Sequence, residues 1–195
     1  MKRRIKRMIL AGLGLTLLLA GSASASSVVP LSLGDLVQQS DLVVEARMLI
    51  GSADWSGTPG SSVVFTYWEL KVLDPIKGPA PARFLVRVPG GRVDDRTLTV
   101  PGAPGFRANQ EVVLFLKRTA EVRRGLAVYE VLGWQQGALA ISADPVTGER
   151  IIPQSPLSGG PGPKKPVALK VKDLKKQIKA LLAHPPGSPP KEVSP

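Results

Sequence analysis

The chain has 195 residues, contains no Cys and carries a formal net charge of +11. The lack of Cys excludes disulfides, thiol nucleophiles and cysteine zinc sites. The charge belongs to residues 1–25 and 161–195, because residues 26–160 hold 13 basic and 13 acidic side chains, and this excludes a basic nucleic-acid-binding domain.

The first 25 residues have the organisation of a secretory signal peptide. Five basic residues among the first seven precede an apolar stretch at 8–20, and Ala23-Ser24-Ala25 forms an A-x-A cleavage site. The apolar stretch is shorter than the roughly 20 residues that span a bilayer. We therefore predict a Sec-type bacterial signal peptide cleaved after Ala25, and a secreted or periplasmic protein with no transmembrane segment after cleavage.

Apolar periodicity and turn residues divide the rest of the chain into short elements. Ser32 and Asp35 have the spacing of a capping box, which predicts a helix start. The predicted elements are a helix at 33–39, strands at 41–50, 63–73, 83–88, 97–100, 110–117, 126–132, 138–142 and 149–152, and a helix at 167–183.

The stretch at 110–117 is the best candidate for the central strand. Residues 112–116 are five consecutive apolar side chains, rich in β-branched and aromatic types. Such a run predicts a strand covered on both faces. Seven or eight short strands separated by turns predict an antiparallel barrel or sandwich.

The sequence after the strands changes in composition. We predict a β-barrel domain at 26–152, a Pro/Gly linker at 153–166, a Lys-rich amphipathic helix at 167–184 and a disordered tail at 185–195. The apolar stripe of the helix contains Val167, Val171, Leu174, Ile178 and Leu181. Its other faces carry Lys170, Lys172, Lys175, Lys176 and Lys179. The helix could dock on the barrel, lie on an anionic membrane surface, or bind a protein or acidic polymer.

The order of several motifs resembles a known architecture. Ser40-Asp-Leu-Val-Val-Glu-Ala46, Leu70-Lys-Val-Leu-Asp-Pro-Ile-Lys-Gly-Pro79 and the strand signals up to Ser142 resemble the netrin-like module. This module is the OB-type barrel of the tissue inhibitors of metalloproteinases, and uncharacterised secreted bacterial β-proteins show the same progression. The resemblance implies a mostly β, OB-like barrel with a short N-terminal helix and one C-terminal amphipathic helix. The N-terminal Cys through which those inhibitors act is missing here.

Candidate binding residues lie in predicted loops. Trp55 lies in a Gly/Ser/Pro-rich loop at 51–62 and Trp134 lies in Gly-Trp-Gln-Gln-Gly, and exposed tryptophans often contact partners. A lid over a barrel end is the alternative for both. Between two strands, Asp94 and Asp95 are flanked by Arg92 and Arg96, which predicts a solvated ion-pair loop rather than a metal site.

No residue set identifies a reaction. His184 is the single His, no G-x-S-x-G motif is present, and no cofactor or metal motif is found. The sequence favours an exported, non-enzymatic binding module that contacts a protein partner through barrel loops. The alternatives are a regulator or inhibitor of a secreted metalloprotease, and a carboxylate-dependent enzyme that uses Asp94 or Asp95.

Overall fold

A computed structural model describes residues 30–56, 63–153 and 168–184. The predicted signal peptide, most of the predicted linker and the predicted tail lie outside these residues. The described part is mostly β, with a short helix α2 (Leu33–Gln39), a C-terminal helix α3 (Val171–Ala183) and a 3₁₀ turn η1 (Trp134–Gly137). This confirms the predicted fold class.

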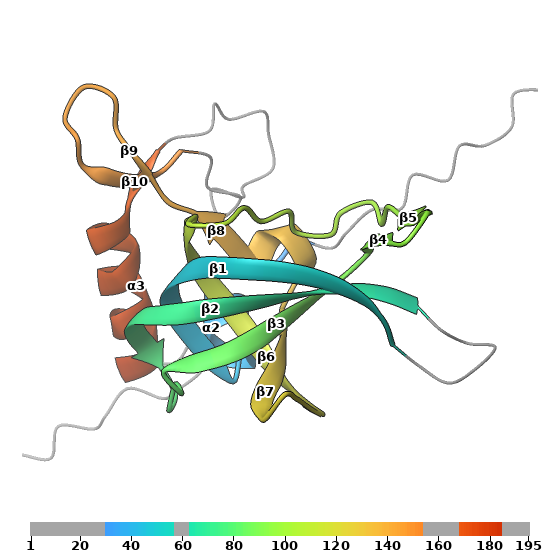
Figure 1. Ribbon diagram of the computed structural model, residues 1–195. Coiled ribbons are helices and arrows are strands. Elements are labelled where there is room, and N and C mark those ends of the chain that lie inside the picture. The colour runs from blue at the N-terminus through green and yellow to red at the C-terminus, as the bar shows by residue number, and fades with distance from the viewer. Residues whose placement is uncertain (1–29, 57–62, 154–167, 185–195) are drawn as a thin grey trace, which may run out of the picture.

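Six of the strands form the main sheet, in the order β1-β2-β3-β7-β6-β8 (Figure 1). β1 also pairs with β6, so five strands close into a ring, but β8 lies outside the ring and the sheet is not a clean barrel. All pairings in the ring are antiparallel except β3 with β7, which is parallel. The strands are β1 (Leu42–Ser56), β2 (Val63–Lys77), β3 (Arg83–Pro89), β4 (Gly91–Val93), β5 (Arg96–Leu98), β6 (Glu111–Arg123), β7 (Leu126–Val131), β8 (Ala138–Ala140), β9 (Ser142–Ala143), β10 (Arg150–Ile152) and β11 (Leu169–Lys170).

β6 is the central strand, as predicted. It pairs with β1, β7 and β8, and none of residues 112–116 is more than 1% exposed. Leu114 and its alternate neighbours face the interior of the ring, whereas Val113 and Phe115 face the helices. A strand covered on both faces needs an unbroken apolar run, which explains its lack of alternation.

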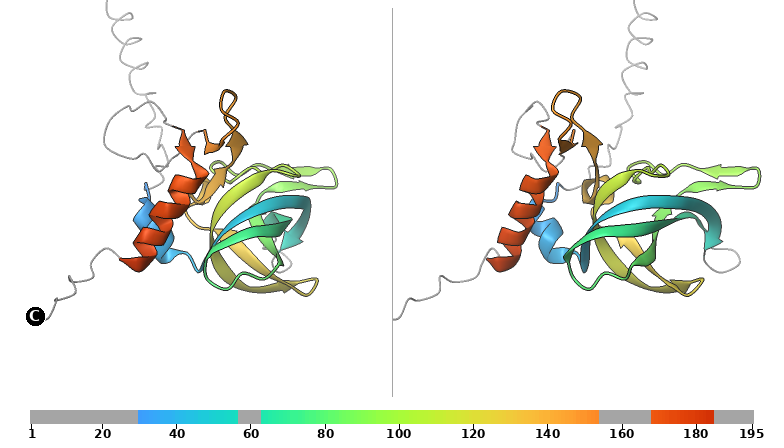
Figure 2. Two further views of the ribbon diagram at one scale, coloured as in Figure 1. Left: turned by 90° about the vertical axis from the view of Figure 1, so that its left-hand side faces the viewer. Right: turned by 60° about the vertical axis from the view of Figure 1, so that its left-hand side comes forward.

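The C-terminal helix docks on the outer face of the sheet. Val171, Leu174 and Ile178 are buried and pack with α2 and with Phe115 of β6. Figures 1 and 2 show α2 and α3 side by side at one end of the strand layer, while the β4–β5 hairpin lies at the other end. The described part of the predicted apolar stripe, from Val171 to Leu181, therefore packs against the rest of the protein, and Val167 lies outside the described residues.

Charged side chains around the buried Glu45 reinforce this docking. The Glu45 carboxylate is only 4% exposed and accepts a hydrogen bond from Nη2 of Arg150 at 2.6 Å. Glu45 also forms an ion pair with Lys175 of α3, whose Nζ donates to Oδ2 of Asp74 at 2.9 Å. Removing one partner of such a cluster leaves a buried charge uncompensated.

The sequence motifs at 40–46 and 70–79 lie in contact where α2 ends. Nζ of Lys77 donates to the carbonyl oxygens of Val37, Gln38 and Ser40 at 2.6, 3.2 and 2.5 Å. These are carbonyls that a helix terminus leaves without helical partners. Burial lowers the pKa of Lys77. Next to it, Gly78 has φ +78°, and a Cβ there would lie 2.6 Å from the backbone oxygen of Asp41.

Replacing Lys77 by Met is expected to lower the free energy of unfolding by about 2 kcal/mol, because three carbonyls lose their donor. Urea denaturation followed by circular dichroism measures this loss. Lys71→Met is the matched control, since Lys71 is exposed on the same strand and should change stability by less than about 0.5 kcal/mol. Equal effects of the two substitutions would contradict the capping role.

Several predicted boundaries were wrong. Residues 51–56 belong to β1 rather than to a loop, because they pair with the apolar start of β2, and this pairing overrides their low strand propensity. β2 continues through Pro75, where a register shift accommodates the missing N–H. The last helix begins at Val171, because Lys170 pairs with Ile151 in β10.

Three further expectations about the strands need correction. The turn residues at 144–148 predict a hairpin of the strands at 138–142 and 149–152, but in the structure β9 pairs with β10 and the preceding β8 pairs with β6. The strand expected at 97–100 is β5 (Arg96–Leu98). Alternation in the strand at 83–88 predicts that Leu85 faces outward with Arg83 and Arg87, but Leu85 is 6% exposed because Tyr67 and Val128 pack around it.

Candidate functional site

A groove of about 330 Å³ lies where β2, β3 and β7 meet the η1 turn, and we call it the Trp134 groove. Most of its lining is apolar, with one basic and one acidic side chain. The lining residues are Phe65, Arg87, Val88, Pro89, Pro104, Glu130, Val131 and Trp134.

Strand register places the side chains of this groove together. Phe65 of β2 is the partner of Pro89 in β3, and Arg87 of β3 is the partner of Glu130 in the parallel strand β7. Side chains of paired residues lie on one face of a sheet, about 5 Å apart. Three strands therefore bring an aromatic ring, a proline and an ion pair side by side.

Trp134 has an unusual backbone conformation for a large side chain. It has φ 58° and follows Gly133, which has φ 67°, so two consecutive residues lie in the left-handed region. This region costs an L-residue about 1–2 kcal/mol. The Trp134 side chain nevertheless stays 42% exposed. Strained backbone conformations are concentrated at functional sites, which makes Trp134 a candidate binding residue.

This backbone strain predicts that a Gly variant at position 134 is more stable than an Ala variant. Trp134→Ala and Trp134→Gly remove the same ring, but only Gly adopts φ 58° without strain. We therefore expect the Gly variant to be more stable than the Ala variant by about 1 kcal/mol, the reverse of the usual order. Thermal denaturation of both variants measures the difference. A more stable Ala variant would show that the left-handed conformation carries no strain.

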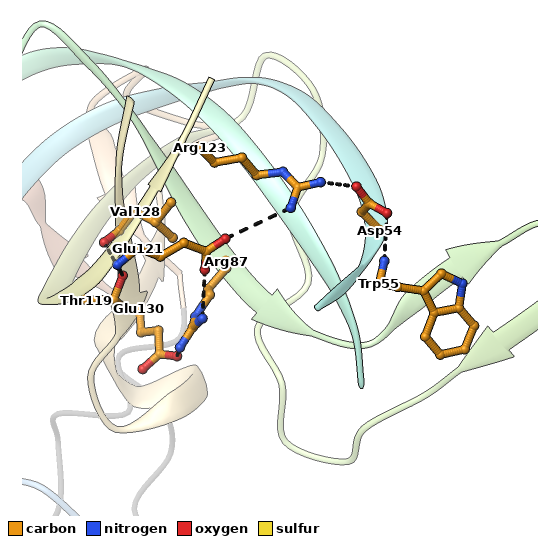
Figure 3. A network of polar contacts seen from close by, with 8 residues as sticks. All are labelled: Asp54, Trp55, Arg87, Thr119, Glu121, Arg123, Val128 and Glu130. Atoms are coloured by element: carbon orange, nitrogen blue, oxygen red, sulfur yellow. Dashed lines mark hydrogen bonds and ion pairs between the residues drawn. The ribbon is translucent and has the colours of Figure 1, made fainter. Parts of the chain in front are cut away.

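The charges at the groove are paired with one another (Figure 3). Nε of Arg87 donates to Oε1 of Glu130 at 2.7 Å, and its Nη1 donates to Oε2 of Glu121 at 2.8 Å. Burial disfavours the charged guanidinium, but the bonds to Glu130 and Glu121 outweigh burial and raise the pKa of Arg87. Arg87 also lies over the Phe65 ring, with its Cζ 5.0 Å from the ring centroid. Arg87 is thus a fixed part of the wall.

The same network continues away from the groove. Arg123 pairs with Asp54 and lies 4.0 Å from Glu121, and its Cζ is 4.3 Å from the centroid of the Tyr67 ring. Burial raises the pKa of Tyr67. These contacts connect the C-terminal end of β6 to β1 and β2. Because Glu121 of β6 also bonds to Arg87, they help to hold Arg87 in position.

The other predicted binding residues lie outside the groove. Trp55 is in β1 opposite Val64, is 40% exposed, and points away from the ion-pair network in Figure 3. The four charged residues at 92 and 94–96 form the exposed tip of the β4–β5 hairpin. There Nε of Arg92 donates to the backbone oxygen of Asp94 at 3.3 Å, and these four described side chains form no ion pair, so the predicted ion-pair loop was wrong.

The predicted lysines of the C-terminal helix do not form a continuous surface of unpaired charges. Lys175 is 22% exposed and bonded to Glu45 and Asp74, while Lys170 and Lys172 both pair with Glu149. Lys176 and Lys179 remain exposed. A helix whose apolar stripe is buried and whose lysines are largely paired is a poor membrane-surface element.

Several other features of the described residues lie outside the Trp134 groove. No group of three or more His, Asp or Glu side chains there could hold a metal ion. His184 ends α3, and its backbone N–H donates to Ala180 at 2.9 Å. A more polar groove of about 600 Å³ is lined by Arg47, Glu111 and Arg150, among others. Hydrogen bonds from Arg47 and Arg150 lower the pKa of Glu111, whose carboxylate pairs with both arginines.

Sequence reasoning found Trp134 but missed Phe65, Arg87 and Glu130. The alternation within the predicted strands places Phe65 on the face shared with Glu69 and Lys71, and it predicts that Arg87 faces outward. Their proximity depends on the register of β2 with β3 and on the parallel pairing of β3 with β7. An aromatic residue on the charged face of one predicted strand and an outward Arg on the next were the available signal.

No protein-family model matches the chain, and no curated protein matches it either. Within the described residues, no helix combines the length and apolar character needed to cross a membrane.

Proposed function

We propose that this protein is an exported, non-enzymatic binding module that holds a protein partner in the Trp134 groove. The observation that carries the proposal is Trp134 itself, an exposed aromatic side chain on a strained backbone at the edge of an apolar groove. Exposed tryptophans in such positions are frequent binding hot spots. The signal-like first 25 residues support the export.

The proposal includes the OB-type, netrin-like barrel that the resemblance implies, and the strand topology supports this fold. Five strands close in a ring, and OB-folds are five-stranded Greek-key barrels that bind ligands on the face of their second and third strands. The Trp134 groove draws Phe65 from the second ring strand and Arg87 from the third. Regulation of a secreted metalloprotease rests only on the family resemblance, and no feature of the groove favours it.

Affinity capture from the periplasm and culture supernatant of the source organism tests the proposal. The bait is residues 26–195, and Trp134→Ala is the discriminating variant. Trp55→Ala is the matched control, because Trp55 has nearly the same exposure, 40% against 42%, but lies outside the groove. The proposal predicts a protein retained by the wild-type and Trp55→Ala baits and lost with Trp134→Ala. Equal retention by all three baits would overturn it.

A further inference from the structure

The walls of the Trp134 groove limit how a ligand can be recognised. β2, β3 and β7 each have a paired strand on both sides within the ring. The β3–β7 pairing ends at Arg87 and Glu130, and of the two β3 residues beyond it Pro89 has no N–H, so an incoming strand finds too few free backbone donors and acceptors there for strand addition. Side-chain contact must supply the recognition.

The apolar part of the groove suits an extended chain without backbone hydrogen bonds. Phe65 and Trp134 provide aromatic surfaces, and Pro89 and Pro104 provide rigid apolar ones. Polyproline II segments satisfy their backbone with water and dock their rings in aromatic-lined grooves. Such a segment is already extended, so little conformational entropy is lost on binding.

The polar part of the groove argues against acidic and sugar ligands. An acidic peptide needs an available guanidinium, but Arg87 is bonded to both Glu121 and Glu130. A sugar needs several polar groups for its hydroxyls, whereas Arg87 and Glu130 are the two charged lining residues and bond to each other. Arg87 is 23% exposed and bonded to two carboxylates, whereas Glu130 is 44% exposed, so the carboxylate is the more accessible charge of the groove lining. A basic side chain complements this charge.

We infer that the Trp134 groove binds an external proline-rich segment with a Lys or Arg beside its prolines. This inference rests on the proposed function and specifies the chemistry of the partner. The prolines pack on Phe65 and Trp134, and the basic side chain lies against Glu130. The chain's own tail at 185–195 has this composition, with five prolines and Lys191, so it is a competing occupant that a test must separate.

Fluorescence anisotropy with a labelled peptide of eight prolines and one central lysine tests the inference on residues 26–195. We expect saturable binding that weakens at least tenfold in Trp134→Ala and is unchanged in Trp55→Ala. Replacing the lysine of the peptide by glutamate should weaken binding at least threefold. In Glu130→Gln this preference for lysine over glutamate should disappear.

Three outcomes would overturn the inference. Lack of binding by the proline peptide, while a captured protein still depends on Trp134, would show that the groove takes another chemistry and would leave the proposed function intact. Peptide binding confined to a protein ending at His184, which keeps every described residue, would show that the chain's own tail occupies the groove. A Trp134-dependent glycan would replace the peptide as ligand.

Discussion

Replacing Leu174 by Ala is expected to lower the free energy of unfolding by about 3 kcal/mol, because a fully buried Leu leaves a cavity when truncated. Leu174 is 0% exposed and packs in the cluster shared by α2, α3 and the outer face of the sheet. Chemical denaturation followed by tryptophan fluorescence measures the change. A loss of this size would show that the C-terminal helix is part of the folded domain.

The matched control for Leu174 lies on the same helix. Leu182 is 37% exposed, so Leu182→Ala removes the same atoms with little loss of packing and should cost less than about 1 kcal/mol. If Leu174→Ala were as mild as Leu182→Ala, the helix would be a loosely attached appendage. Its apolar stripe would then be available for a membrane or a partner.

Replacing Trp134 by Ala is expected to weaken partner binding by at least 30-fold, or about 2 kcal/mol, the cost typical of a binding hot spot. The Trp134 ring lines the groove and is 42% exposed in the unbound protein, so a ligand can still bury much of it. Surface plasmon resonance with the captured partner measures the dissociation constant for each variant.

Two controls separate binding from folding in this experiment. Trp134→Gly should bind as weakly as Trp134→Ala although it is the more stable of the two, because it lacks the ring but tolerates φ 58°. Trp55→Ala should bind like the wild type. If the affinity of the partner instead changed in proportion to the stability of each variant, position 134 would act only through the fold.

The secondary structure was largely predictable because it depends on local sequence patterns, such as helix-cap spacing and apolar runs. The Ser32–Asp35 spacing predicted α2, and both reciprocal hydrogen bonds of the capping box are present. The apolar run at 112–116 predicted the central strand. The errors occurred where pairing overrides local preference, as at residues 51–56, whose polar and small side chains extend β1 because β2 lies beside them.

The groove could be predicted only in part because its geometry is non-local. Arg87 and Glu130 are 43 residues apart and meet through a parallel pairing that no turn signal indicates. Lys175 is one of the five lysines predicted for the polar faces of the helix, yet it pairs with Glu45, 130 positions earlier in the chain. Sequence periodicity shows which face a side chain occupies, but it does not show which strand lies next to it.

The most direct measurement of the central claim uses the indole N–H signals of the three tryptophans in a nitrogen-15 nuclear magnetic resonance spectrum. Trp134 lines the groove, Trp55 lies outside it, and Trp68 packs in the interior cluster of the ring, so the signals report three different environments. Single Trp→Phe substitutions assign the signals. On addition of the captured partner, we predict a shift or loss of the Trp134 signal and little change at Trp68 and Trp55. An unchanged Trp134 signal together with a shifted Trp55 signal would contradict binding in the Trp134 groove. It would place the binding site near Trp55, where the end of β1 pairs with the start of β2.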